Sequence, residues 1–485
     1  MDRTSPRSFF ITLFALLLLL GTCACSVPLA PGYQIVNETR EIRFGPGDTP
    51  EIGIRARYTL KNSGTADLEF IDITFPDAKA YGLTDLKVEL DGHGAKLVDL
   101  PQEFQTESPN TSRLRFDSVW KRGEKHELAS EYTFRSPADP GDRVSIGQQD
   151  FHLGSRGWSL LPLPPKHFLS PFPARRNPTS YSVIVPSDFL VLAGGTLKGR
   201  QQSGATTNFK FELRKSDMPP AIVAGRYVAS HPEPKANSAI FWTLQPLKDD
   251  PRAAVEKITA VWNALTNDFG PLGKNIRVPH IVESTSIGSQ ELPQSIPAAV
   301  AFPGGVLVSP ALLSLGLNSE AFQERVTHEL AHNWFGGEVF FSRFTAIGLG
   351  EGLPEYATIV ADESQKGEAG RRARVLNYLR EYDEARKNAE EIPLGIATRT
   401  DPLTQQRIAE AKAALFFVAV EDTCGEKQMR DGLKELIELL RGQEVNYDVL
   451  RAQLEHVSGK NLADLFRVWL NDKGIPEDFR ARYES

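Results

Sequence analysis

Two histidines and a glutamate in the segment VTHELAHNWFGG, residues 326–337, have the types and spacing of a hydrolytic metal site. His328 and His332 are four residues apart, so in a helix both imidazoles leave the same face about one turn apart. Two neutral imidazoles held in this way can occupy two corners of a zinc tetrahedron. Glu329, directly after the first histidine, is placed to act as general base toward a metal-bound water. The pattern predicts a catalytic zinc site.

A third ligand is expected from the next helix. Glu351 lies nineteen residues after His332, at the start of the helical pattern GLPEYATIV, and Pro354 suits the first turn of that helix. A carboxylate from this position completes the His₂Glu set of a catalytic zinc and leaves the fourth position for water. We therefore expect one Zn²⁺ per chain, bound by these three side chains.

Glu355 follows Glu351 by four residues and is expected on the same helix face. From there it could accept a hydrogen bond from a liganding histidine and so orient that imidazole. The alternative interpretation is a solvent-exposed helical glutamate, which is a common feature of proteins.

The helix that carries the histidines has recognisable ends. In LNSEAFQERVTHELAHNWFGG, Asn318 or Ser319 is the expected N-cap, and Gly336 and Gly337 are expected to stop the helix. The aromatic pair that follows the second histidine, Trp334 and Phe335, is expected to pack into the core.

The hydrophobic pattern predicts a multidomain fold. Over residues 33–231 apolar and polar residues alternate, as in IGIRARYTLKNSGTADLEFIDITFP, where KNSG is typical of a hairpin turn. This pattern favours an all-β domain of the sandwich or saddle type. Residues 232–485 begin with an amphipathic helix after Asp250 that stops at Gly270, and after a few short strands helices dominate. The second domain is therefore expected to be α+β and mostly helical.

The amino terminus, residues 1–25, resembles a targeting signal. Two arginines precede the twelve-residue apolar run FFITLFALLLLL, which is too short to span a bilayer. Cys25, preceded by Ala24, fits a bacterial lipoprotein signal better than Cys23 does; a simple secretory signal cut near Ala24 is the alternative. We expect an extracytoplasmic protein tethered to a membrane by lipid, on the periplasmic or cell-surface side.

The composition limits which classes of protein and which partners are expected. The chain of 485 residues is 41% hydrophobic and 24% charged, which is typical of soluble globular domains. Its net charge of −7 and its lack of Lys/Arg runs give no sign of a nucleic-acid partner, so none is expected. After Cys25, only Cys424 remains, so no intrachain disulfide is expected. The oligomeric state is not predicted.

The zinc motif resembles a known family. His-Glu-x-x-His, eighteen further residues and then a glutamate, with NWFG after the second histidine, is similar to the gluzincin metallopeptidases. The likeness is greatest to the membrane alanyl aminopeptidase family, and it extends to SDMPPAIVAGRY and VSGKNLADLFRVWLNDKGIP. The resemblance implies an N-terminal saddle domain, a thermolysin-like catalytic domain and zinc-dependent hydrolysis of peptide or protein substrates. It is strong over residues 319–362 and weaker over the rest of residues 33–485.

Two features of that family are missing. Its members carry a Gly-x-Met-Glu-Asn strand, whose glutamate binds the free amine of the substrate. In AAVAFPGGVLVSPALL, Phe302 and Pro303 stand in place of the Glu–Asn pair, and Glu291 is the nearest acid in the sequence. The strand itself is still expected to pair with a peptide backbone. Standard aminopeptidase specificity is therefore not expected.

The second missing feature is a tyrosine that donates to the oxyanion in a Tyr-x-Lys context. IAEAKAALFF keeps Lys412 and Ala413 but has Glu410 at the tyrosine position. Losing one oxyanion donor typically costs about 10²–10³ in rate. Candidates to replace it are Tyr356, Tyr378, Tyr382, Arg399 and Arg407.

Three functions remain open. The favoured one is a zinc metallopeptidase with atypical specificity. The second is a zinc-binding pseudo-peptidase that serves as a peptide-binding or assembly module. The third is a gluzincin similar to the glycyl aminopeptidases, which also carry an E-G-x-x-acid-Tyr pattern like EGLPEY here.

Overall fold

The computed structural model describes most of residues 32–485. Within that range the description omits residues 65, 77–81, 100–110, 136–143, 155–157, 164–178, 214–220, 230–237, 273–275, 277, 286, 288–297, 342–344, 346, 399 and 400. The predicted signal segment with Cys25 lies outside the described residues, as do Glu291, Arg399 and the domain boundary near residue 232. The statements about these residues stay predictions.

The β-rich part is built around one large sheet. In spatial order its strands are β14 (Thr196–Ser203), β15 (Thr206–Leu213), β12 (Thr179–Pro186), β1 (Tyr33–Gly45), β2 (Glu51–Asn62), β8 (Lys125–Arg135), β4 (Leu83–Leu90) and β5 (His93–Gly94). Along β2, residues 52, 54, 56, 58 and 60 are buried, so the alternation in the sequence corresponds to one inward face.

Two smaller sheets lie in the same part of the chain. One has the order β13 (Leu190–Ala193), β16 (Ile222–Gly225), β10 (Asp150–Leu153) and β9 (Val144–Ile146). The other has the order β11 (Leu161–Leu163), β3 (Leu68–Thr74), β7 (Thr111–Trp120) and β6 (Lys96–Asp99). Buried side chains from all three sheets form one hydrophobic core.

The turn at KNSG does not join a hairpin, which corrects the prediction. β2 pairs with β1 and β8, whereas β3 pairs with β11 and β7 in a different sheet. The buried Asn62 amide explains the change of sheet, because it donates to the carbonyls of Ala66 and Trp120 and accepts from the Gly64 N–H. Local alternation identified the strands but could not tell which strands are neighbours.

The second part contains a five-stranded sheet and the helices. The sheet order is β17 (Val228–Ala229), β18 (Ile240–Thr243), β19 (His280–Glu283), β21 (Gly305–Val308) and β20 (Ala299–Phe302), so β20 is an edge strand. The helices are α4 (Arg252–Phe269), α5 (Pro310–Ser314), α6 (Glu320–Ala331), α7 (Gly352–Lys366), α8 (Glu368–Arg386), the 3₁₀ turn η1 (Leu394–Ile396), α9 (Leu403–Cys424), α10 (Glu426–Leu440), α11 (Tyr447–Ser458), α12 (Ala463–Asn471) and α13 (Glu477–Glu484). The predicted fold class, an all-β part followed by a mostly helical α+β part, is confirmed.

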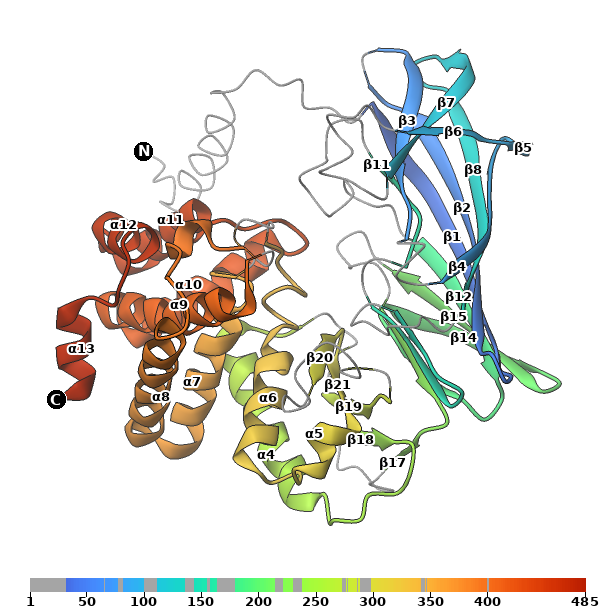
Figure 1. Ribbon diagram of the computed structural model, residues 1–485. Coiled ribbons are helices and arrows are strands. Elements are labelled where there is room, and N and C mark those ends of the chain that lie inside the picture. Colours follow the sequence, from blue (N-terminus) through green and yellow to red (C-terminus); the bar gives the residue numbers. More distant parts are fainter. Residues whose placement is uncertain are drawn as a thin grey trace, which may run out of the picture.

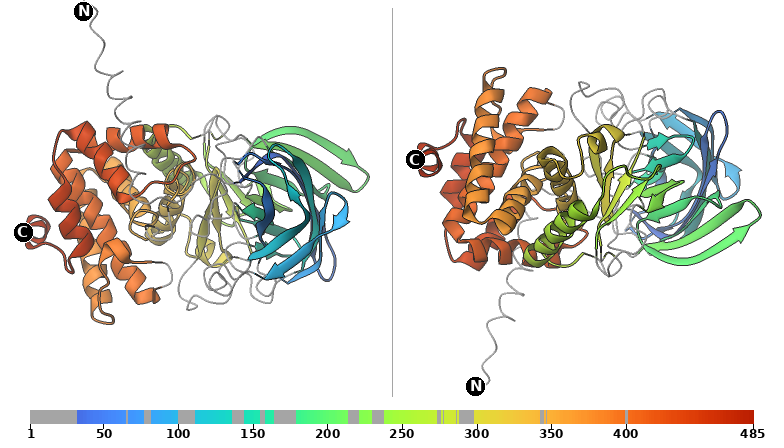
Figure 2. Two further views of the ribbon diagram at one scale, coloured as in Figure 1. Left: turned by 90° about the horizontal axis from the view of Figure 1, so that it is seen from above. Right: turned by 90° about the horizontal axis from the view of Figure 1, so that it is seen from below.

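The five-stranded sheet lies between the β-rich part and the C-terminal helices (Figures 1 and 2). A small apolar cluster joins the two β regions, with Val223 of β16 packed against Val282, Phe302 and Leu307 of the five-stranded sheet. Asp150 of β10 strengthens the junction, because its carboxylate accepts hydrogen bonds from the Ser284 and Thr285 hydroxyls at 3.2 and 2.7 Å. The β-rich part is thereby fixed against the sheet whose edge strand faces α6.

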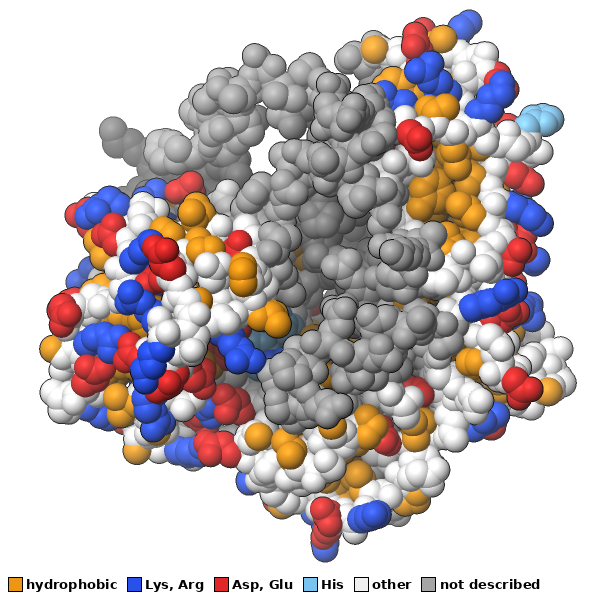
Figure 3. Space-filling view, viewed as in Figure 1, with side chains coloured by type: hydrophobic (Ala, Val, Ile, Leu, Met, Phe, Trp, Pro, Cys, Tyr) orange, Lys and Arg blue, Asp and Glu red, His pale blue; other side chains and the backbone are white. Residues whose placement is uncertain are grey.

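The surface of the described residues shows mixed charge. On the face drawn in Figure 3, Asp/Glu and Lys/Arg side chains alternate over the C-terminal helices, without a continuous basic area among the described residues. This distribution agrees with the lack of Lys/Arg runs in the sequence. No helix in the described part of the chain is both long and apolar enough to cross a bilayer.

Candidate metal centre

The helix α6 presents the two histidines and ends earlier than predicted. Its N-cap is Ser319, whose hydroxyl accepts a hydrogen bond from the Phe322 N–H at 3.2 Å. The helix stops at Ala331 instead of near Gly336, because the N–H groups of Asn333 and Trp334 bond to carbonyls three residues back in a tighter turn. His332 is the C-cap residue and keeps helical dihedral angles of −60° and −17°. Its imidazole therefore still shares a face with His328.

Glu351 reaches the same place from the N-terminus of α7. It is the residue directly before the first helical residue, Gly352, and Pro354 lies in the first turn as predicted. A side chain at position 352 would place its Cβ 2.5 Å from the Cβ of Ala413 on α9. The glycine after Glu351 therefore allows α7 to approach α9 closely, and this contact helps to fix the position of Glu351.

The three predicted ligand atoms form a nearly equilateral triangle. The Nε2 atoms of His328 and His332 are 3.1 Å apart, and Oε2 of Glu351 is 3.3 Å from each of them. In a tetrahedron with metal–ligand distances of about 2.0–2.1 Å, ligand atoms are about 3.3 Å apart. The triangle has the size of one face of such a tetrahedron, so these residues fit a zinc ion.

Each imidazole has an oxygen atom 3.1 Å from its other nitrogen. Nδ1 of His328 lies 3.1 Å from Oε1 of Glu355, and Nδ1 of His332 lies 3.1 Å from the carbonyl oxygen of Phe335. The Tyr378 hydroxyl donates to Glu355 and thereby holds that carboxylate. Partners of this kind leave both Nε2 lone pairs directed at the same point. The geometry favours the predicted orienting role of Glu355 over that of an exposed glutamate.

The charges around His328 favour a bound cation. Burial alone would lower the pKa of its imidazole, but the carboxylates of Glu355 and Glu351 outweigh burial and raise the pKa well above its usual value. Burial likewise disfavours the Glu355 carboxylate, yet His328 and the Tyr378 hydroxyl lower its pKa. A divalent cation on the Nε2 side would satisfy the same carboxylates in place of the proton.

Glu329 lies beside the triangle and is held by the edge strand. A carboxylate oxygen of Glu329 and the nearest nitrogens of His328 and His332 all lie within 4.8 Å of one another. Its Oε2 accepts a hydrogen bond from the Ala301 N–H of β20 at 3.0 Å. Because Glu351 is closer to both histidines, we favour Glu351 as the third ligand and Glu329 as the base beside it.

The edge strand is fixed to α6 at a second point. The β20–β21 turn passes through Pro303 and Gly304, and Gly304 has a φ of 89°, which favours glycine. The Gly304 N–H donates to Oδ1 of Asn333 at 2.7 Å. Asn333 directly follows His332, so this bond couples the position of β20 to that of the second ligand.

Arg325 is a site residue that the sequence analysis missed. It lies four residues before Glu329 on α6, and its Nε is 3.7 Å from Oε1 of Glu329. Burial alone would lower the pKa of its guanidinium, but nearby carboxylates raise it; these are Glu329, Glu355, Glu351 and Glu410. Its side chain keeps 39% of its surface exposed. The i, i+4 spacing from Glu329 was the available sequence signal.

The two family features absent from the sequence have structural consequences. Phe302 is only 4% exposed and packs into the cluster that joins the β regions, so it fills space and offers no polar group. Glu410 on α9 is close enough to Arg325 to help raise the pKa of its guanidinium. Lys412, which follows the family pattern, is buried and donates to Glu391 and to the Asp472 carbonyl, both at 2.6 Å. Lys412 therefore has a packing role in this chain.

The tyrosine candidates for oxyanion stabilisation are engaged elsewhere. Tyr356 donates to Glu421, Tyr382 donates to Glu391, and Tyr378 donates to Glu355, with each ring buried. Arg407 is exposed on α9. Tyr378 is linked to the ligands through Glu355, whose carboxylate lies beside His328.

The predicted packing role of Trp334 and Phe335 is confirmed. Both side chains are fully buried against α4, where Trp334 packs on Trp262 and Phe335 packs on Phe269. The Trp334 indole N–H donates to the Gly270 carbonyl at 2.7 Å. These contacts fix the end of α6 that carries His332.

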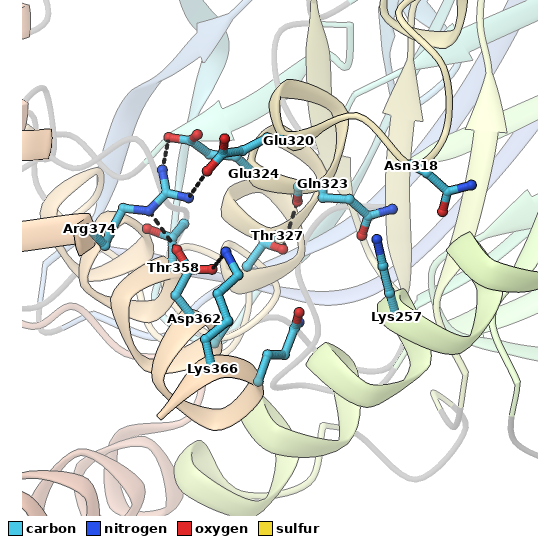
Figure 4. A pocket seen from close by; sticks show the side chains of 12 residues that line it. Lys257, Asn318, Glu320, Gln323, Glu324, Thr327, Thr358, Asp362, Lys366 and Arg374 are labelled. Atoms are coloured by element: carbon cyan, nitrogen blue, oxygen red, sulfur yellow. Dashed lines mark hydrogen bonds and ion pairs between the residues drawn. The ribbon is translucent and has the colours of Figure 1, made fainter. Parts of the chain in front are cut away.

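A separate pocket of 270 Å³ lies where α6, α7 and α8 meet (Figure 4). Apart from Lys257, its charged side chains are paired with each other, since Arg374 contacts Asp362 at 2.7 Å and Glu324 at 2.6 Å. Lys366 also contacts Asp362 at 3.0 Å. The pocket contains none of the predicted metal ligands, and its ion pairs link the three helices.

Comparison with known proteins agrees with this geometry. The family described as the Peptidase family M1 domain matches residues 299–469, which include β20, both histidines and Glu351. Over these residues the chain is similar to the family M1 peptidases. The resemblance to the membrane alanyl aminopeptidase family predicted from the sequence is confirmed.

The curated proteins similar to the chain include two from rice. Aminopeptidase M1-B from Oryza sativa subsp. japonica is 26% identical over 174 residues, which is 35% of this chain and 20% of the relative. Aminopeptidase M1-C from the same organism is 25% identical over 155 residues, which is 31% of this chain and 18% of the relative. The chain therefore spans about a fifth of the length of the curated relatives it matches.

The likeness to solved structures covers both parts of the chain. The M1 zinc metallopeptidase from Deinococcus radiodurans has a TM-score of 0.64 at 15% identity, over 92% of this chain and 95% of that chain. A point mutant of that metallopeptidase, bound to a Tyr-Ser-Ala substrate, has a TM-score of 0.62 at 16% identity, with the same coverage. At this level of identity, the match shows that the two-part fold is shared.

Proposed function

We propose that the protein is a zinc-dependent metallopeptidase that hydrolyses peptide bonds with atypical specificity. The observation that carries the proposal is the triangle of His328, His332 and Glu351, with Glu329 beside it. Three ligands of this type with a free fourth position are typical of catalytic zinc, whereas structural zinc sites use four protein ligands. The solved M1 zinc metallopeptidases of the same fold support the choice of metal.

Each side chain of the site has a separate role in the proposed hydrolysis. When bound, zinc polarises the scissile carbonyl and lowers the pKa of a water molecule. Glu329 accepts the proton of the attacking water and passes it to the leaving amine. The Ala301 N–H holds one oxygen of Glu329, so the carboxylate is oriented before the substrate arrives. Glu355 and the Phe335 carbonyl keep the histidines in the tautomer that binds metal.

Specificity should differ from that of a standard aminopeptidase. Phe302 is buried in an apolar cluster at the position where relatives carry the amine-binding glutamate. A hydrogen bond to a charged group contributes about 1.5–3 kcal/mol, which is roughly a 10- to 100-fold preference for a free amine. Without that carboxylate, a free substrate amine has no advantage.

The first prediction concerns substrates with and without a free amine. The soluble form lacking residues 1–25 is expected to cleave N-acetylated and unmodified versions of one peptide with kcat/KM values within about tenfold, and to act poorly on amino-acid anilides. Liquid chromatography with mass spectrometry of a mixed peptide library would identify the cleaved bonds. A preference of 100-fold or more for the free amine would contradict the proposed specificity.

Glu410 favours one alternative function. At this position relatives carry the tyrosine that donates to the oxyanion, and the described tyrosine candidates donate to other carboxylates. A zinc-binding pseudo-peptidase that only binds peptides would be consistent with this loss. That function would replace the peptidase if zinc-loaded protein bound peptides from the library and cleaved none. Cleavage confined to peptides with a free amino-terminal glycine would instead support a function similar to that of the glycyl aminopeptidases.

We also propose that the chain acts outside the cytoplasm as a lipoprotein anchored through Cys25. The apolar run followed by Ala24 and Cys25 supports this assignment. In a bacterial host, Cys25→Ser should move the protein from the membrane fraction to the soluble fraction, and Cys23→Ser should leave it with the membrane. Immunoblots of fractionated cells would distinguish the two. Release by Cys23→Ser alone would assign the anchor to Cys23, and release by neither would overturn the proposal.

A further inference from the structure

Arg325 is a basic group beside the proposed general base, Glu329. It lies on the same face of α6 as His328, Glu329 and His332, and its Nε is 3.7 Å from Oε1 of Glu329. That distance is beyond a hydrogen bond, and the Nε atom is buried without a hydrogen-bond partner among the described residues. The guanidinium therefore has unused donors beside the base.

The position of Arg325 relative to Glu329 determines which side of the substrate it meets. Glu329 delivers a proton to the leaving amine, so the leaving residue, called P1′, must lie beside its carboxylate. Arg325 is one helical turn from Glu329, in the direction away from His332. The guanidinium thus lies on the P1′ side and away from the carbonyl that the metal would polarise.

We infer that Arg325 selects substrates with a carboxylate on the P1′ residue. The inference rests on the proposed peptidase function and specifies its substrate class. Guanidinium groups bind carboxylates through two parallel hydrogen bonds, a geometry that suits the free N–H groups of Arg325. The carboxylate belongs either to an Asp or Glu side chain at P1′ or to the free C-terminus of a substrate that ends there.

A further carboxylate is favoured on grounds of charge as well. Zn²⁺ would neutralise the charge of Glu351 and of one other acid of the site. The electrostatic attraction between the site carboxylates and the Arg325 guanidinium would therefore be weaker when metal is bound. Arg325 can then pair with a substrate carboxylate without leaving an uncompensated buried charge. A P1′ lysine would instead place two cations together beside Glu329, which is unfavourable.

The test compares matched peptides that differ only at P1′. All peptides are assayed with the zinc-loaded protein. One set compares Glu with Gln at P1′. A second set compares a free with an amidated C-terminus, and in each set the C-terminus lies either at P1′ itself or three residues beyond it. Arg325→Gln should reduce the Glu-to-Gln ratio of kcat/KM, or the free-to-amidated ratio at P1′, by about 10- to 100-fold. The ratio that changes identifies the source of the carboxylate. The control Arg467→Gln, an exposed arginine on α12, should leave both ratios unchanged.

Binding provides a readout that does not depend on cleavage. In the Glu329→Gln background, titration calorimetry with the same peptides should show tighter binding of the carboxylate version, and adding Arg325→Gln should remove that preference. A role confined to positioning Glu329 would slow all peptides equally and leave the binding ratios unchanged, which would overturn the inference. Preferential binding in this background, together with no cleavage of any peptide by the zinc-loaded wild-type protein, would overturn the proposed peptidase function and leave the inference intact.

Discussion

Replacing Glu329 with glutamine should lower kcat/KM for every cleaved peptide by about 10²–10⁴-fold, because the side chain can no longer accept a proton from the attacking water. The amide keeps the shape of the carboxylate, and its oxygen can still accept from the Ala301 N–H. The zinc content should therefore stay at the wild-type level. Initial rates on the best library peptides, together with metal analysis of the same samples, would measure both quantities.

The control for this variant is Glu320→Gln. Glu320 lies in the first turn of the same helix, its side chain is 80% exposed, and its nearest cation is Arg374 at 3.9 Å. This change should leave both rate and zinc content close to wild type. Unchanged peptide profiles for wild type and Glu329→Gln would show that Glu329 is not the base and would favour the pseudo-peptidase.

Replacing Glu351 with glutamine should have the largest effect on metal binding. The change removes the only predicted anionic ligand and leaves two imidazoles, so we expect zinc to be lost on dialysis and hydrolysis with it. Glu355→Gln should have a smaller effect, weakening zinc binding by about 10- to 100-fold, because Glu355 contacts His328 and not the metal position. Competition with a chelator would rank the two variants.

Glu368→Gln is the matched control for these two variants. Glu368 is exposed in the first turn of α8 and far in sequence from the ligands, so zinc affinity should match wild type. Circular dichroism would check that each variant folds. If Glu351→Gln retained full zinc affinity while Glu329→Gln lost the metal, Glu329 would be the third ligand and Glu351 the base, which reverses the roles proposed here.

The ligand set could be predicted from the sequence because helix geometry is local. The spacing of His328 and His332, and that of Glu351 and Glu355, fixes which side chains share a face regardless of the rest of the fold. The end of α6 was predicted less well, since the N–H groups of Asn333 and Trp334 bond to carbonyls three residues back, which the spacing of the residues does not reveal. His332 still reaches the ligand position, because its own dihedral angles remain helical.

Other parts of the site depend on contacts between distant segments. The Ala301 N–H that holds Glu329 comes from a strand 28 residues away, and its availability follows from β20 being an edge strand. The hydroxyl partners of Tyr356, Tyr378 and Tyr382 are likewise set by helix packing, so spacing alone could not separate them. Arg325 is different, because its i, i+4 spacing from Glu329 could be read from the sequence.

The strand pairing illustrates the same limit in the β-rich part. Alternating residues identified β2 and β3, but the buried amide of Asn62 sends the chain to another sheet, where a hairpin was predicted. A side chain that bonds three separate backbone groups is a tertiary feature. Periodicity within a short window carries no information about it.

Diffraction at the zinc absorption edge, from crystals of the chain lacking residues 1–25 and loaded with zinc, tests the central claim most directly. The account predicts one anomalous peak per chain, about 2.0–2.2 Å from Nε2 of His328, Nε2 of His332 and a carboxylate oxygen of Glu351. The absence of a peak after loading, or a metal bound by Glu329 in place of Glu351, would contradict it.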